Sequence, residues 1–169
     1  MKTIIYYFTG TGNSLAAAKK IAAAIRDCEL VPIASQKNSP GKIVPAADRV
    51  GIVSPVYDAG LPVIVKEFAK RLDIGAVPYA FGIVTMGGMG ISALHQLNRI
   101  LLQSSRKNLD AAFGVKMPGN FPPVGVPPAG HKKEEILRKA DAELAAIAVT
   151  IQKGQTVPPG FSPLTSLLR

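Results

Sequence analysis

Residues 9–14 read Thr-Gly-Thr-Gly-Asn-Ser, and this stretch decides the fold of the chain. An apolar run, residues 4–8, precedes it, and an alanine-rich stretch with helical periodicity begins at Leu15. The pattern predicts a buried strand, a tight hydroxyl-rich turn and a helix. Glycines let the backbone approach a ligand, and the first turn of a helix offers unpaired N–H groups and a positive dipole end. The segment therefore predicts a site for a phosphate monoester.

Three other phosphate-binding patterns do not fit this sequence. A Walker loop needs a lysine after its second glycine, and neither this turn nor residues 82–88 supply one. A dinucleotide-binding loop needs a third glycine where Leu15 stands, and a tyrosine-phosphatase loop built on Cys28 needs an arginine where Ala34 stands. A loop that binds one terminal phosphate without a lysine remains.

The composition predicts one compact globular domain. The chain has 169 residues, of which 47% are hydrophobic. No stretch approaches the roughly 18 uncharged apolar residues of a membrane span, and the start does not resemble a signal peptide, so we expect a cytoplasmic protein without membrane contact. Cys28 is the single cysteine, which excludes an internal disulfide and any all-cysteine metal or iron-sulfur site within this chain.

The charge of the chain is strongly positive, at +9. Such a charge is typical of nucleic-acid binders, but here the basic residues are dispersed in small groups and aromatic residues are too few for a base-stacking platform. We therefore expect no nucleic-acid partner. The functional interpretation that remains is attraction to an acidic redox partner or domain.

Strand-like and helix-like segments alternate along the chain, which indicates an α/β protein with a parallel sheet. Pro32 lies in the second apolar run and cannot donate a ladder hydrogen bond, so this strand is expected at a sheet edge. The expected strands are residues 2–8, 29–33, 49–54, 79–85 and 109–116. The first expected helix begins at Leu15, and the other three cover residues 61–72, 91–101 and 134–151.

Three later loops also follow predicted strands, and in a parallel sheet they lie at the same edge as the first turn. The first contains Tyr57, which is either an aromatic face for a planar ligand or a half-buried packing residue. The second, residues 85–90, is glycine-rich and by itself an ordinary turn. The third, residues 117–130, is proline-rich and long for a plain connection, which favours a binding or lid role.

These motifs together resemble the flavodoxin-like family, whose first loop holds the phosphate of FMN. The resemblance implies a three-layer αβα sandwich with a five-stranded parallel sheet in the order 2-1-3-4-5. It implies Tyr57 beside the flavin ring and the glycine-rich loop against the pyrimidine edge. The residues expected to contact FMN are Thr9, Gly10, Thr11, Gly12, Asn13, Ser14, Pro55, Val56, Tyr57, Asp58, Ala59, Gly60, Thr85, Met86, Gly87, Gly88, Asn120 and Phe121.

A narrower similarity, which adds residues 55–62 and 117–121, is to flavodoxin-ferredoxin fusion proteins. It covers about residues 1–153, the expected FMN-binding domain, while residues 154–169 are expected to form a Pro/Gly-containing tail or linker. The cysteine-rich module of those proteins is missing here, so the chain is either a fragment or a stand-alone relative. The resemblance implies electron exchange with a ferredoxin-type iron-sulfur partner and needs no catalytic acid or base and no metal.

Two alternatives stay open at this point. One is an FMN-dependent NAD(P)H reductase of quinones or flavins on the same fold, although no nucleotide-recognition motif is visible. The other is a flavin-free regulatory domain of the receiver kind, which lacks support because Thr9 and Gly10 stand where paired acids are needed. In the resembling family a peptide of the second loop can turn toward the flavin, and the expected equivalent here is the Ala59–Gly60 peptide.

Overall fold

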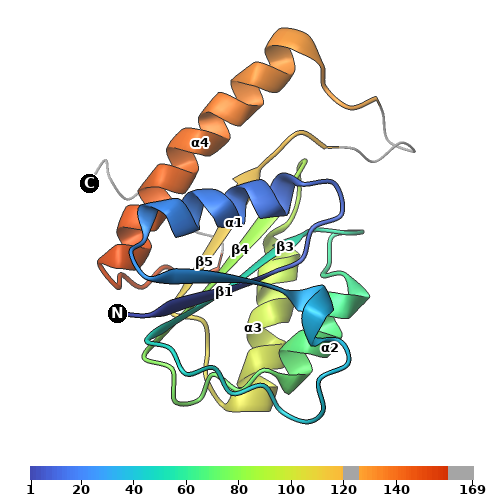
Figure 1. Cartoon of the computed structure of the whole chain (residues 1–169). Coiled ribbons are helices and arrows are strands. Elements are labelled where there is room, and N and C mark those ends of the chain that lie inside the picture. Colours follow the sequence, from blue (N-terminus) through green and yellow to red (C-terminus); the bar gives the residue numbers. More distant parts are fainter. Residues whose placement is uncertain (120–125, 160–169) are drawn as a thin grey trace.

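A computed structural model describes residues 1–119 and 126–159 of the chain. A five-stranded, fully parallel sheet forms its centre, in the order β2-β1-β3-β4-β5 (Figure 1). Both the α/β class and the predicted strand order are therefore confirmed. The strands are β1 (Thr3–Tyr7), β2 (Cys28–Pro32), β3 (Arg49–Pro55), β4 (Tyr79–Met86) and β5 (Ala111–Lys116). The helices are α1 (Asn13–Ala24), the short 3-10 helix η1 (Ile33–Gln36), α2 (Val63–Arg71), α3 (Ile91–Ser105) and α4 (Gly130–Gln152).

The helices cover the sheet in two layers, because each face of the buried strands is apolar. Helices α1 and α4 pack on one face, and α2 and α3 pack on the other (Figure 1). Each layer has its own core cluster, one centred on Ile21, Phe81 and Phe113 and one on Ile52, Leu72 and Leu97. The three-layer sandwich that the family resemblance implies is thus present.

The predicted edge strand is also found. β2 pairs only with β1 among the described strands, and its last residue, Pro32, is exposed opposite Tyr7. Because a proline has no N–H to donate, this position at the end of an edge strand removes little from the sheet. Cys28 begins β2, and burial raises the pKa of its thiol to about 11. This thiol therefore stays protonated at neutral pH.

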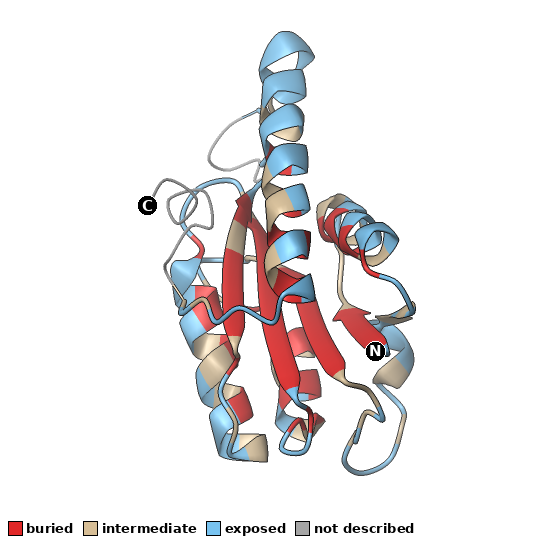
Figure 2. Cartoon of the chain, turned by 90° about the vertical axis from the view of Figure 1, so that its left-hand side faces the viewer, coloured by how far each residue is buried: buried red, intermediate tan, exposed pale blue. Residues whose placement is uncertain are grey.

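Helix α4 is longer than the predicted helix and projects beyond the sheet (Figure 2). Its buried residues begin at Ala140, whereas residues 131–135 are exposed. None of the helices in the described ranges is long and apolar enough to cross a membrane.

The chain keeps contact with the sheet after α4 ends. Val157 forms a parallel bridge with Ala111, and its N–H donates to the carbonyl of Asp110 at 3.0 Å. The hydroxyl of Tyr79 donates to the carbonyl of Gln155 at 2.8 Å. The predicted division at residue 153 stays a prediction, and the structure adds that residues 155–157 pack on the domain.

Candidate functional site

Four loops meet at the carboxyl ends of β1, β3, β4 and β5, where the strand order reverses direction. In doubly wound sheets this switch point is where ligands bind, because the loops on its two sides diverge and leave a crevice. Hydrogen bonds link the loops directly: Val56 N–H donates to the Thr85 carbonyl at 3.1 Å, and Met117 N–H donates to the Met86 carbonyl at 2.9 Å. The four predicted loops therefore form one rim.

The turn from Thr9 to Gly12 leaves the N-terminus of α1 open. Gly12 has a φ of 98°, a left-handed conformation that glycine adopts without strain, and its N–H donates to Thr9 Oγ1 at 3.0 Å. No side chain caps α1, and its first turn contains no acidic residue. The free N–H groups and the positive end of the helix dipole are thus available to an anion.

The hydroxyl of Ser14 is engaged elsewhere than the sequence indicated. It lies 2.7 Å from Thr85 Oγ1, and both side chains are buried, so this contact ties the first turn of α1 to β4. The role of these two residues in cofactor binding stays a prediction.

We expect the Ser14–Thr85 hydrogen bond to stabilise the domain beneath the turn. Ser14→Ala or Thr85→Val alone leaves one buried hydroxyl without a partner, and each costs about 1–3 kcal/mol. The double variant removes both polar groups, so its free energy of unfolding in urea should fall by clearly less than the sum of the two single losses. Additive losses would contradict a direct interaction between these side chains.

The fourth loop contacts the first one across the rim. Asn13 Nδ2 donates to the carbonyl of Pro118 at 3.0 Å, and a Cβ added to Gly87 would lie 3.2 Å from the Cα of Gly119. The sequence assigned a binding or lid role to residues 117–130 but did not name Pro118 or Gly119 among the contact residues. The predicted contact residues Asn120 and Phe121 lie outside the described residues.

The ring of Tyr57 lies between the first two loops. Its exposed fraction is 48%, it meets Phe8 edge to face at a centroid distance of 6.5 Å, and its hydroxyl approaches Gly10. A Cβ added to Gly10 would come within 2.2 Å of that hydroxyl oxygen. Part of the ring therefore packs on the first loop while about half of the residue stays exposed, and its contact with a planar ligand stays a prediction.

A substitution at Gly10 should act through Tyr57. Gly10→Ala forces the ring to move because of the 2.2 Å contact, whereas after Tyr57→Phe the nearest ring atom lies 3.5 Å from the new methyl group. We expect Gly10→Ala to lower ligand affinity in the parent chain and to have a clearly smaller effect in the Tyr57→Phe background. The measurement is a ligand titration of the parent, both single variants and the double variant. Equal effects of Gly10→Ala in the two backgrounds would remove Tyr57 from the explanation.

The turn that follows Tyr57 holds two residues with positive φ. Tyr57 and Gly60 exchange both of their backbone hydrogen bonds, at 2.9 and 2.8 Å, and the residues between them, Asp58 and Ala59, have φ of 48° and 60°. Two positive φ values are the mark of a type I′ turn, which glycine, asparagine and aspartate adopt readily and which is costly for an alanine such as Ala59. The sequence predicted the Ala59–Gly60 peptide as the flexible part of this loop, and the structure places the positive φ values at Asp58 and Ala59.

Helix α3 supports that strained turn. Gln96 Oε1 accepts a hydrogen bond from Leu61 N–H at 2.9 Å, and the Ser92 hydroxyl donates to the carbonyl of Ala59. No sequence signal pointed to these two residues, because they are about 35 positions away and lie on an ordinary amphipathic helix. Only the packing of α3 beside α2 brings them to the rim.

The glycines of the loop after β4 have different roles. Gly88 has open space where a Cβ would be, whereas a Cβ on Gly90 would lie 2.4 Å from Met86 Sδ and 3.0 Å from Val56 Cγ2. Gly90 thus permits close packing with the second loop, and Gly88 leaves its backbone accessible. Met89 is 88% exposed at the tip.

The rim is nearly uncharged. Within the described loop residues 8–12, 56–62, 87–90 and 117–119, the one charged side chain is Asp58. An anion at the first turn would therefore be held by neutral donors, namely backbone N–H groups and the hydroxyls of Thr9 and Thr11, together with the dipole of α1. This donor set suits a terminal phosphate group, and it supplies no acid or base for proton transfer.

The fold and this site define a class of protein, the doubly wound α/β domains with one anion-binding turn at the switch point of the sheet. A family model described as Flavodoxin domain matches residues 4–118. The chain therefore belongs to the flavodoxin-domain family, and this part of the resemblance is confirmed.

Solved structures agree on the fold. A flavodoxin from the domain Archaea has 17% identity and a TM-score of 0.56, with 90% of this chain and 99% of that chain covered. Two-electron reduced flavodoxin from Megasphaera elsdenii has 19% identity and a TM-score of 0.52, covering 83% and 98%. A Lactobacillus acidophilus flavoprotein in complex with FMN has 18% identity and a TM-score of 0.53, covering 67% and 92%. A comparison with curated protein sequences gives no significant match.

Proposed function

We propose that this chain binds FMN at the rim and works as an electron-transfer protein. The observation that carries the proposal is the open N-terminus of α1, which faces the switch point beside a half-exposed tyrosine ring. The phosphate of FMN is a single terminal dianion, which matches an anion site made of neutral donors. The neighbour from Lactobacillus acidophilus, whose structure contains FMN, supports this choice.

The residues of the chain have separate tasks in this proposal. The N–H groups at the start of α1, with Thr9 and Thr11, hold the phosphate, while Asn13 keeps the first and fourth loops together. Tyr57 lies against the ring, and Gly88 leaves backbone groups accessible to the ring's polar edge. FMN itself supplies the electron chemistry, and the protein supplies position and electrostatics.

The test of FMN binding compares two ligands that differ only in the phosphate. Protein purified from cells is examined for a flavin absorption spectrum, and the flavin-free chain is then titrated with FMN and with riboflavin, following the quenching of flavin fluorescence. We expect FMN to bind at least about 100-fold more tightly, since two or more charge-assisted hydrogen bonds are lost with riboflavin. Equal affinity for the two ligands, or no binding of either, would reject the phosphate site.

A second experiment separates an electron carrier from an NAD(P)H reductase. The FMN-loaded chain is mixed anaerobically with NADH, NADPH, reduced ferredoxin or dithionite, and bleaching of the flavin is recorded. We expect rapid bleaching with ferredoxin or dithionite and slow bleaching with either nicotinamide nucleotide. Rapid bleaching by NADH or NADPH would favour the reductase.

We further propose a ferredoxin-type iron-sulfur partner, either separate or fused as in flavodoxin-ferredoxin fusion proteins. The net charge of +9 supports an acidic partner, because opposite charges steer association. Val157 forms a bridge with Ala111, at the amino end of β5. At 3.3 Å per residue this point is about 20 Å from the rim. An iron-sulfur module fused after Val157 must therefore extend along the length of the sheet to reach the flavin.

Asp58 should tune the potential of the bound flavin. Its carboxylate is the one charge in the described rim loops, and repulsion disfavours added electron density on a nearby ring. We expect Asp58→Asn to raise the midpoint potential by roughly 10–40 mV, a small shift because the side chain is exposed and screened by solvent. A redox titration of parent and variant measures this, and an unchanged potential would remove Asp58 from the tuning of the flavin.

A further inference from the structure

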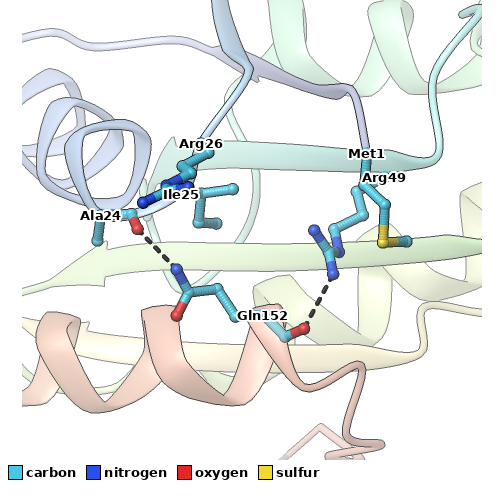
Figure 3. A pocket seen from close by; sticks show the side chains of 6 residues that line it. All are labelled: Met1, Ala24, Ile25, Arg26, Arg49 and Gln152. Atoms are coloured by element: carbon cyan, nitrogen blue, oxygen red, sulfur yellow. Dashed lines mark hydrogen bonds between the residues drawn. The ribbon is translucent and has the colours of Figure 1, made fainter.

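A pocket lies at the end of the sheet opposite to the rim. It has a volume of about 330 Å³ and is lined by Met1, Ala24, Ile25, Arg26, Arg49 and Gln152 (Figure 3). Arg49 begins β3, whereas the rim lies at the carboxyl end of the same strand. The two sites are about 20 Å apart along β3, at 3.3 Å per residue, so they cannot share one small ligand.

Arg49 is the central feature of this pocket. Its exposed fraction is only 8%, and its Nη2 donates to the carbonyl of Gln152 at 2.9 Å, at the end of α4 (Figure 3). Among the described residues, no carboxylate oxygen lies within 4.0 Å of its guanidinium group. Buried charges in proteins are normally paired with an opposite charge, and among the described residues Arg49 has no such partner within this distance.

The other guanidinium nitrogens of Arg49 are open to the pocket. In the part of the chain that the structure describes, Thr3 Oγ1 is the single buried side-chain polar atom without a hydrogen-bond partner. The Arg49 nitrogens that do not contact Gln152 must therefore reach solvent, and the pocket is where they do so. Thr3 pairs with Arg49 in the sheet register, so its unpartnered hydroxyl lies on the same face of the sheet as the arginine side chain.

A second positive charge and two helix ends surround the same space. Arg26, next to the end of α1, lines the pocket, and no described carboxylate lies within 4.0 Å of it either. The ends of α1 and α4 each contribute about −0.5 charge, which offsets only about half of the two arginines. The carbonyl of Ala24 is already satisfied by Gln152 Nε2 at 2.7 Å, and Asp48 accepts a hydrogen bond from Lys2 N–H at 2.8 Å. The residues that line the pocket include two guanidinium groups and no carboxylate.

We propose that this pocket binds a small oxyanion, a phosphate or carboxylate group, through Arg49 and Arg26. The planar guanidinium group donates in pairs to the oxygens of both kinds of anion. The apolar walls formed by Met1 and Ile25 suit the organic part of a small molecule that carries such a group. The site does not depend on flavin binding, because it lies at the opposite end of the strands.

Nuclear magnetic resonance on the full chain tests this proposal residue by residue. The ¹⁵N-labelled protein is titrated with inorganic phosphate and, separately, with acetate at the same ionic strength. We expect saturable shifts of the Arg49 Nε–H, the Gln152 side-chain amide and the amides of residues 24–26. Shifts with phosphate alone identify a phosphate site, and shifts with both anions identify a general oxyanion site. Binding at the first turn is read separately, from the amides of residues 10–15.

Three variants separate specific binding from general attraction. Arg49→Gln and Arg26→Gln should each weaken the pocket's affinity for the anion about 10-fold or more, since each removes charge-assisted hydrogen bonds. Arg99→Gln removes the same charge from the exposed surface of α3 and should change the affinity less than about twofold. If Arg49→Gln fails to fold because α4 loses its contact, the exposed Arg26 still decides the outcome. Absence of saturable shifts, or equal losses in all three variants, would overturn the proposal and leave both arginines as helix-end contacts.

Discussion

Gly12→Ala is expected to abolish measurable FMN binding while the domain stays folded. Gly12 has a φ of 98°, and no atom lies within 4 Å of the place where a Cβ would be, so the substitution meets no clash within the protein. Its cost is conformational, because an alanine disfavours this backbone and the turn that presents the N–H groups of α1 must change. Losing two charge-assisted bonds to the phosphate corresponds to an affinity at least about 100-fold lower.

Gly41 and Gly88 provide matched controls for that experiment. Gly41 also has a positive φ, 72°, and open space around its Cβ position, but it lies in the loop between η1 and β3. Gly41→Ala should therefore carry the same backbone cost and leave FMN affinity unchanged. Gly88→Ala adds a methyl group at the rim without a positive φ and should have an intermediate effect. FMN titration and thermal unfolding of all three variants are the measurements, and unaltered affinity in Gly12→Ala would refute the assigned turn.

Gly51→Ala should cause the largest loss of stability among single-methyl additions to the sheet. Gly51 lies on β3 opposite Phe81 of β4, and a Cβ there would come within 2.3 Å of the ring's Cζ and 2.4 Å of its Cε2. Phe81 is fully buried and cannot move without displacing α1 and α4. Overpacking of this kind costs about 1–3 kcal/mol, and each kcal/mol lowers the melting temperature by about 2–4 °C in a domain of this size.

A double variant tests the cause of that loss. Phe81→Leu alone leaves a cavity and is itself destabilising, but it also removes the ring atoms that the new methyl group would meet. The free energy of unfolding of Gly51→Ala/Phe81→Leu should therefore be higher than the sum of the two single effects predicts. If the two effects add, the contact between Gly51 and Phe81 does not limit packing at this position.

The outline of the fold was predictable because its signals are local. Apolar runs of strand length alternate with helical periodicity, and Pro32 alone placed one strand at an edge. Periodicity was less accurate at the ends of helices. Ile91, where the third predicted helix begins, is 46% exposed because it belongs to the first turn of α3, at the rim.

The sequence by itself determined the alternation of elements and the turn of residues 9–14, since both depend on residues that are adjacent in the chain. The tertiary structure decided which polar side chains of the turn are already hydrogen-bonded, because Ser14 meets Thr85 and Asn13 meets Pro118 only after β4 and β5 take their places. It also decided the pocket around Arg49, whose lining residues come from the N-terminus, the end of α1, the start of β3 and the end of α4. Contacts between distant segments carry no local pattern, so no reading of neighbouring residues could have revealed them.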